Sequence, residues 1–209
     1  IIMSITGDDL PVQVTHIPGI TRVKYTNSIN QDVRLVTAGE DHLVRLLPSE
    51  PTATDVIPLV LEDATQKISW IEANSKYLVT ASEDGAVRLY QHALQSEDDP
   101  QKATSCIRMV RREVLPVRCV SLERATESPR AAICSDELII RVANVEDPRQ
   151  ITLLTGHTRG VRAASWSPIL PLLVSCGSDG DIRVWDMSST DGSCVKVISN
   201  QLAALRPES

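Results

Sequence analysis

Short runs of alternating apolar and polar residues recur along the chain, and a small polar turn precedes each run. Ala86–Tyr90 and Asp181–Trp185 both alternate in this way and follow Asp-Gly pairs. Alternation with a period of two predicts a half-buried β-strand. Asp-Gly between two strands predicts a tight hairpin, because these residues tolerate the left-handed backbone of such a turn. No helical stripe of useful length appears, so we expect an all-β protein.

One strand–turn–strand unit occurs four times along the chain. The acidic residues at its turns stand 43, 52 and 43 residues apart, and they are Asp41, Asp84, Asp136 and Asp179. A WD-repeat blade of a β-propeller runs roughly 40–45 residues, and the polar stretch 95–102 explains the longer interval as a loop insertion. A further strand precedes each hairpin, at 20–25, 67–71, 117–122 and 161–166. The pattern therefore predicts a WD-repeat β-propeller with about four blades.

The repeat also sets the predicted domain organisation. We expect a lead-in over residues 1–14, propeller blades over 15–198, and a tail or the start of another blade over 199–209. The predicted units are 15–50, 56–94, 104–147 and 151–187. Each unit supplies three strands, and a fourth comes from across the link to its neighbour.

Composition mainly excludes other classes of protein. Phe is absent and aromatic residues make up 3%, so Val, Leu and Ile must form most of the core. No apolar run approaches the roughly 20 residues of a membrane span, so we expect no membrane partner. The cysteines number five and never form a Cys-x-x-Cys pair, which argues against a disulfide framework and a zinc site. We expect no metal and no cofactor.

Charge is unevenly distributed along the chain. The net charge is −6, yet residues 101–165 hold 11 basic and 7 acidic side chains. Such a basic middle is either a solvated face or a partner surface. Its densest cluster is Arg108, Arg111 and Arg112, and without interleaved aromatic residues it indicates direct nucleic-acid contact only weakly.

A candidate partner rim follows from where four other arginines stand. Loops that lead into the inner strands of a propeller gather at one rim, and loops often carry binding function. The arginines in or beside these segments are Arg22, Arg118, Arg159 and Arg162. The alternative is that they only keep this surface soluble.

The fourth unit carries the fullest set of polar markers. We expect the carboxylate of Asp179 to accept a hydrogen bond from the imidazole of His157. The imidazole would in turn bond the hydroxyl of Ser175, and that hydroxyl would bond the indole N–H of Trp185. This network would fasten the hairpin to the loop before the blade. The other three units keep their turn acids but not this set.

The same residues invite a different interpretation, because Ser, His and Asp also form hydrolase triads. No Gly-x-Ser-x-Gly elbow surrounds Ser175, and the residues fall at the positions of a structural network. Asp179-Gly-Asp181 similarly resembles part of a calcium loop but lacks the other ligands. We therefore expect structural roles and no catalysis.

Several phrases resemble one family of WD-repeat proteins more closely. They are His16-Ile-Pro-Gly-Ile-Thr, Arg34-Leu-Val-Thr-Ala-Gly, Leu115-Pro-Val-Arg and Ser135-Asp-Glu-Leu. They are similar to the N-terminal propeller of the eukaryotic replisome adaptors, which include the chromosome transmission fidelity adaptor, the acidic nucleoplasmic DNA-binding protein and the fungal SepB-type proteins. The resemblance covers most of residues 15–187 and is of a fungal type.

The resemblance implies a nuclear, non-catalytic adaptor in DNA replication, repair and sister-chromatid cohesion. Its partners would be replisome proteins, namely the helicase and polymerase α complexes, with chromatin or DNA contact indicated only weakly. A family propeller has about seven blades, and four would leave open edges, so we expect this chain to be a piece of a longer protein. The alternative function is another WD-repeat scaffold, such as a ubiquitin-ligase substrate receptor or a chromatin reader.

Overall fold

Four antiparallel sheets of four strands each make up the computed structural model, which describes residues 19–26, 34–48, 59–74, 76–91, 106–123 and 129–199. The first sheet contains β1 (Ile20–Thr26), β2 (Arg34–Gly39), β3 (Val44–Pro48) and β4 (Leu59–Leu61). The second contains β5 (Ile68–Ala73), β6 (Tyr77–Ser82), β7 (Ala86–Gln91) and β8 (Cys106–Arg112). The third contains β9 (Val117–Leu122), β10 (Arg130–Ser135), β11 (Ile139–Asn144) and β12 (Ile151–Thr155). The fourth contains β13 (Val161–Trp166), β14 (Leu172–Gly177), β15 (Asp181–Asp186) and β16 (Ser193–Ser199).

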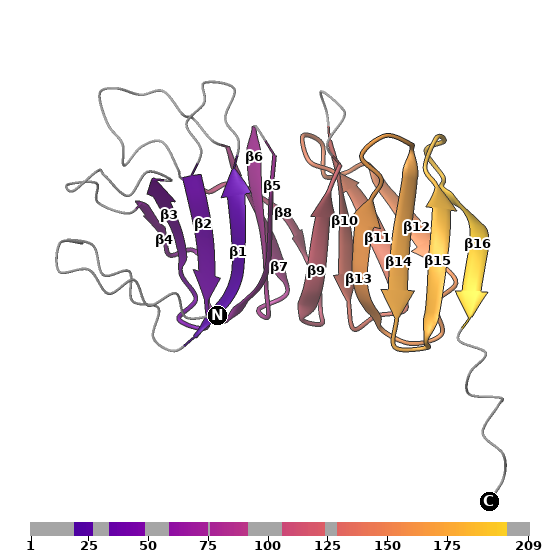
Figure 1. The fold of residues 1–209 in the computed structure, drawn as a ribbon, viewed down its shortest axis with the longest axis horizontal. Coiled ribbons are helices and arrows are strands. Elements are labelled where there is room, and N and C mark those ends of the chain that lie inside the picture. Colours follow the sequence, from indigo (N-terminus) through magenta and orange to yellow (C-terminus); the bar gives the residue numbers. More distant parts are fainter. Residues whose placement is uncertain are drawn as a thin grey trace, which may run out of the picture.

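The sheets stand side by side in chain order, with the first strand of each on the inside. β1 contacts β5, β5 contacts β9, and β9 contacts β13. Figure 1 shows the first sheet at one end of this row and the fourth sheet at the other, each turning a broad face to the viewer. This arrangement of radiating meanders is part of a β-propeller, as the repeat predicts.

Along the sequence, the fourth strand of each sheet comes after the hairpin of that sheet. β4, β8 and β12 are hydrogen-bonded to β3, β7 and β11 of the preceding unit. The units predicted at 56–94, 104–147 and 151–187 therefore each straddle two sheets. The lead-in and all of the tail except Ser199 lie outside the described residues.

Apolar side chains fill the seams between consecutive sheets. Val36 and Leu46 pack on Ile71 at the first seam, and apolar clusters fill the second and third, the third with Trp166 and Trp185. Val, Ile, Leu and Ala make up most of these clusters, in keeping with the lack of Phe. Burying one Val, Leu or Ile side chain stabilises the fold by about 1.5–3 kcal/mol, so the packing in these seams stabilises the fold.

The cysteines are free thiols wherever the structure describes them. Cys119 and Cys134 lie opposite each other on β9 and β10 and are fully buried. Cys194 on β16 is exposed, so it does not take the core role that small apolar side chains usually take.

A bulge at the second residue of each first strand repeats through all four sheets. The bulged residues are Thr21, Ser69, Arg118 and Arg162. The hydroxyl of Thr21 lies 2.8 Å from the carbonyl oxygen of Ile68 in the next sheet, and that of Ser69 lies 2.5 Å from the carbonyl oxygen of Val117. A bulge re-aims its side chain, and here it directs polar groups across the first two seams.

Candidate functional site

The four polar residues predicted as a network in the fourth sheet are linked by hydrogen bonds. His157 Nδ1 lies 2.9 Å from Asp179 Oδ2, and His157 Nε2 lies 2.8 Å from Ser175 Oγ. Trp185 Nε1 donates to the same Ser175 Oγ at 2.9 Å. Because a carboxylate only accepts, Nδ1 carries the imidazole proton and the serine hydroxyl donates to Nε2. This series of hydrogen bonds joins the loop before β13 to β14, to the hairpin turn and to β15.

Asp179 is the fixed point of this network. The backbone N–H groups of Thr158 and Asp181 donate to its two carboxylate oxygens at 2.8 and 3.1 Å. Burial raises the pKa of Asp179, but the hydrogen bonds from Thr158, His157 and Asp181 outweigh it and lower that pKa to about 2. The turn acid is therefore ionised at neutral pH and accepts hydrogen bonds with both oxygens.

Gly177 is a structural residue that the sequence alone did not single out. A Cβ at this position would lie 2.6 Å from both Asp179 Oδ1 and His157 Nδ1. Only glycine leaves room for the histidine–carboxylate pair at this point. The signal was present as the Cys-Gly-Ser run before Asp179, but only the tertiary approach of His157 explains it.

Strand register corrects one turn assignment. Counting from the ends of β10 and β11, the residue equivalent to Asp41, Asp84 and Asp179 is Glu137 rather than Asp136. Asp136 lies in the same turn, one position earlier, where the first two sheets have Glu40 and Glu83. The Asp-Glu pair allowed either alignment, and only the equal lengths of the flanking strands decide between them.

The second sheet replaces the network with an ion pair. Ala64 stands where the fourth sheet has His157, and Arg88 bonds Asp84 instead, with Nη2 2.7 Å from Oδ2. Thr80 occupies the position of Ser175, is fully buried, and its hydroxyl has no hydrogen-bond partner. Loss of the histidine thus leaves a polar atom unsatisfied in the core.

In the third sheet, a glutamate replaces the histidine and forms an ion pair with the hairpin. Glu113 stands at the histidine position, and its Oε2 lies 3.0 Å from Arg141 Nη1. Arg141 Nη2 lies 2.6 Å from Glu137 Oε2. In the first sheet Arg45 bonds Asp41 at 2.7 Å, and His16, at the matching spacing before Ile20, lies outside the described residues. The tie between hairpin and preceding loop is therefore a histidine–carboxylate pair in the fourth sheet and a glutamate–arginine pair in the third. In the first two sheets the arginine–aspartate pair lies within the hairpin.

The geometry argues against a hydrolase site at Ser175. The residue is 1% exposed, and its oxygen is already engaged by both the imidazole and the indole N–H. A nucleophile must reach the reacting carbon of a substrate. This hydroxyl lies inside the seam instead, where it ties strands together.

The predicted rim arginines do not form one basic patch. Arg118 and Arg162 do come together, because Asp136 lies between them at 2.6 and 2.8 Å. The hydrogen bond from Arg118 and the charges of both arginines lower the pKa of Asp136 despite the opposing effect of burial. Lys67 pairs with Glu40, and Arg118 also pairs with Glu83. This end of the sheets is therefore a rim of alternating charge.

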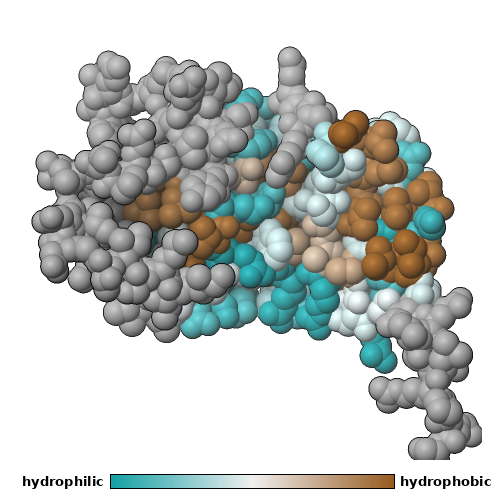
Figure 2. Space-filling model, in the orientation of Figure 1, coloured by the Kyte–Doolittle hydropathy of each residue, from teal (hydrophilic) through white to brown (hydrophobic). Residues whose placement is uncertain are grey.

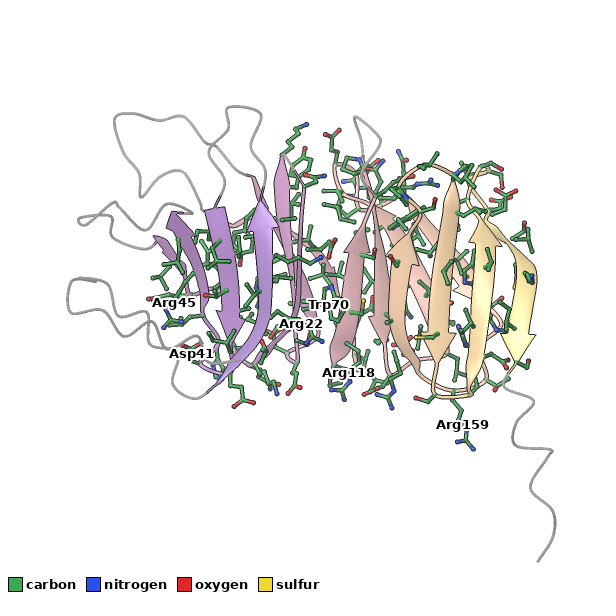
Figure 3. All side chains as sticks on the ribbon, in the orientation of Figure 1. Arg22, Asp41, Arg45, Trp70, Arg118 and Arg159 are labelled. Carbon is green, nitrogen blue, oxygen red and sulfur yellow. The ribbon has the colours of Figure 1, made fainter. Side chains whose placement is uncertain are left out.

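The other two rim arginines lie apart from this cluster. The guanidinium of Arg22 stacks over the indole of Trp70, 4.3 Å from the ring centroid, on the inner strands (Figure 3). Arg159 lies in the loop before β13 and points away from the ribbon (Figure 3). It is exposed and has no ion-pair partner among the described residues. Arg159 is thus the rim cation most available to a partner.

The described residues offer few other chemical sites. They contain no group of three His, Cys, Asp or Glu side chains that would hold a metal ion. They also contain no helix with the length and apolar character needed to cross a membrane. The side chains of Arg108, Arg111 and Arg112 lie outside the described part of the chain.

Comparison with known protein families gives a match that includes most of the fourth sheet. The family described as "WD domain, G-beta repeat" matches residues 148–186, which hold β12 to β15 and the whole polar network. This WD repeat supplies the outer strand of the third sheet and three strands of the fourth sheet. All four sheets share one strand order, so the chain forms blades of a WD-repeat β-propeller.

Several WD-repeat proteins are similar to parts of this chain. Nuclear distribution protein nudF 1 of Talaromyces marneffei is 40% identical over 76 residues, which are 36% of this chain and 16% of that protein. Human striatin-4 is 30% identical over 129 residues, 56% of this chain and 17% of striatin-4. WD repeat and HMG-box DNA-binding protein 1 of Xenopus laevis is 28% identical over 183 residues, 88% of this chain and 14% of the relative. The chain thus spans less than a fifth of each of these relatives.

Proposed function

We propose that these blades belong to a non-catalytic scaffold that acts at the DNA replication fork in the nucleus. The observation that carries the proposal is the similarity to WD repeat and HMG-box DNA-binding protein 1, which extends over 88% of this chain. The other two relatives match shorter parts, at 36% and 56%. The Leu115-Pro-Val-Arg and Ser135-Asp-Glu-Leu phrases support the same family of replisome adaptors.

The rim favours a protein partner over nucleic acid. Phosphate binding needs clustered cations that are not already neutralised. Asp136 and Glu83 neutralise Arg118 and Arg162, and Arg22 stacks on Trp70, which leaves Arg159 as the rim arginine with neither contact among the described residues. A rim of alternating charge suits a protein surface of complementary charges. We expect replisome proteins, namely the helicase and polymerase α complexes, to be the partners.

Affinity capture from nuclear extract tests this function. The wild-type chain should recover helicase and polymerase α subunits, and Arg159→Glu should reduce that recovery about tenfold, since a reversed rim charge mainly slows association. Arg149→Glu is the matched control, because Arg149 is also exposed and lies in the β11–β12 loop at the opposite end of the sheets. If both variants recover the helicase and polymerase α subunits equally well, the rim is not the surface that binds them.

A second candidate is a different WD-repeat scaffold. The higher identities to nudF 1 and striatin-4 favour it, although over less of the chain. Recovery of cullin adaptors in the same capture would favour a ubiquitin-ligase substrate receptor. Recovery of histones alone would favour a chromatin reader. Either result would replace the replisome proposal.

A further inference from the structure

Two loops and one hairpin turn come together at the rim beside the third sheet. The loop before β13 lies against the β10–β11 turn, because a Cβ on Gly160 would lie 2.8 Å from the carbonyl oxygen of Asp136. The loop before β9 reaches the same turn through Arg141, which pairs with Glu113 in that loop and with Glu137 in the turn. Residues of both loops and of the turn therefore form one continuous surface.

Val114 stands at a position of this surface where the other loops have a polar residue. Counting back from β5 and β13, the equivalent residues are Thr65 and Thr158. The backbone N–H of each donates to the acid of the adjacent hairpin turn, at 3.2 and 2.8 Å, so this position lies directly beside the turn. In the third sheet it holds Val114, which is 94% exposed. Leu115 follows at 39% exposure, at the position of Arg159 in the next loop.

Leu138 is the third apolar residue of this surface. It follows the turn acid, where the second and fourth sheets have Gly85 and Gly180, and it is 49% exposed. A turn position that accepts glycine does not require an apolar side chain. Figure 2 shows hydrophilic residues along the lower edge of the second and third sheets, which is the end where this turn lies. Grouped apolar side chains in polar surroundings mark an interaction site, and we call Val114, Leu115 and Leu138 the rim patch.

An unpaired cation lies beside the rim patch. Arg159 directly precedes Gly160, is exposed, and has no ion-pair partner among the described residues. Arg118 and Arg162, by contrast, both pair with Asp136. Figure 3 shows Arg118 and Arg159 at the same end of the sheets. An acidic side chain of a ligand can therefore pair with Arg159 without breaking an existing ion pair.

The size of the rim patch favours a peptide segment over a folded domain. A specific interface between folded proteins buries about 800 Å² on each partner, which is more than three side chains supply. A single large apolar side chain of an extended segment is enough to cover a patch of this size. Such an anchor residue typically provides most of the binding energy of a small interface.

We propose that the rim patch binds an extended protein segment that carries a large apolar residue and, a few positions away, an acidic residue. The apolar side chain packs on Val114 and Leu138, and the carboxylate pairs with Arg159. The inference rests on the proposed function, because it names the chemistry by which the scaffold recognises a protein partner.

Selection from a phage-displayed library of random peptides, with the purified full chain as bait, tests the charge preference. We expect the enriched peptides to combine a large apolar residue with Asp or Glu. With Arg159→Glu as bait, Lys or Arg should replace these acids, because the partner's charge must complement the rim. A bait that enriches a new class of peptide is folded, so this exchange does not depend on stability. No enrichment by the wild-type chain, or the same peptides from both baits, would overturn the inference.

Fluorescence polarisation with synthetic copies of the enriched peptides tests the apolar contact. Val114→Asp and Leu138→Asp should each raise the dissociation constant about tenfold or more, as for a residue that contacts an anchor side chain. Ile169→Asp is the matched control, because Ile169 is 87% exposed but lies in the β13–β14 loop at the opposite end of the sheets. Unchanged binding by both patch variants, or an equal loss in the control, would contradict the proposed contact.

Two results separate this inference from the proposed function. Peptides with the expected pattern, together with a nuclear capture that recovers no replisome protein, would support the rim patch and overturn the replisome role. Recovery of replisome proteins by a chain that enriches no peptide would support the replisome role and overturn the rim patch.

Discussion

At the scale of single residues, two buried hydroxyls at equivalent register positions have opposite effects on the stability of the fold. Ser175 and Thr80 occupy the same place in β14 and β6, and both are buried. Ser175 bonds His157 and Trp185, whereas the hydroxyl of Thr80 has no partner because Ala64 replaces the histidine. An unmade buried hydrogen bond costs more than a made one contributes.

Opposite effects on stability should follow from removing these two hydroxyls. Ser175→Ala should lower the free energy of unfolding by roughly 1–3 kcal/mol, because the indole N–H of Trp185 loses its acceptor. Thr80→Val, which swaps the unsatisfied hydroxyl for a methyl group of the same shape, should raise it by about 1 kcal/mol. Urea denaturation followed by tryptophan fluorescence measures both. A loss of stability in Thr80→Val would show that this hydroxyl has a partner.

Asp179 should make stability depend on pH in the acid range. Its pKa in the fold is about 2, below the ordinary value of 3.8. The carboxylate therefore stabilises the fold fully above about pH 4, and this contribution disappears as pH falls toward 2. Asp179→Asn should flatten that part of the profile in urea titrations between these pH values. Asp191→Asn, an exposed carboxylate of the same sheet, should leave the slope unchanged, and equal slopes for all three proteins would contradict the assignment.

At the scale of elements, the hairpin turns of the first, second and fourth sheets use one backbone shape with different residues. Gly85 and Gly180 have φ angles of 81° and 83°, and His42 takes φ 68° at the same position of the first sheet. A side chain in this region costs energy that glycine avoids. A Cβ on Gly85 would also lie 2.3 Å from the carbonyl oxygen of Glu113. In the second sheet, Gly85 thus suits the turn both by its conformation and by the close approach of the Glu113 backbone.

Two substitutions at this turn position should act in opposite directions. Gly85→Ala should destabilise the chain by roughly 1–3 kcal/mol. His42→Gly should stabilise it by roughly 0.5–1 kcal/mol, because the left-handed strain disappears. Gly19→Ala is the control, since no atom lies within 4 Å of the added Cβ. Thermal denaturation compares all three, and a neutral Gly85→Ala would mean that Glu113 moves aside at little cost.

At the scale of the whole molecule, stability should decrease from the inner seams to the outer edge. β9 and β10 lie between the second and fourth sheets and have almost entirely buried side chains, whereas all seven residues of β16 are exposed. Stability in repeat proteins is approximately a sum of unit and neighbour terms, so a strand without outer neighbours opens most readily. Hydrogen exchange followed by mass spectrometry should show slow exchange at β9 and β10 and fast exchange at β16. Similar rates at β10 and β16 would contradict this order.

The sequence by itself determined the repeat, the all-β class, the inner strands and the polar chain of the fourth blade. Each of these depends on local alternation or on residues at short, regular spacing, which the one-dimensional order records directly. The sequence did not determine which of two adjacent sheets contains each fourth strand, because pairing between strands of different repeat units leaves no local sequence pattern.

Tertiary structure decided the remaining points. It assigned Glu137 to the turn position, because only flanking strand lengths separate it from Asp136. It turned a predicted basic rim into one of alternating charge, because Asp136 and Glu83 come from other parts of the chain to meet Arg118. It also decided which apolar residues are buried, since Val79 and Val174 share one register position but only Val79 is buried against a following sheet.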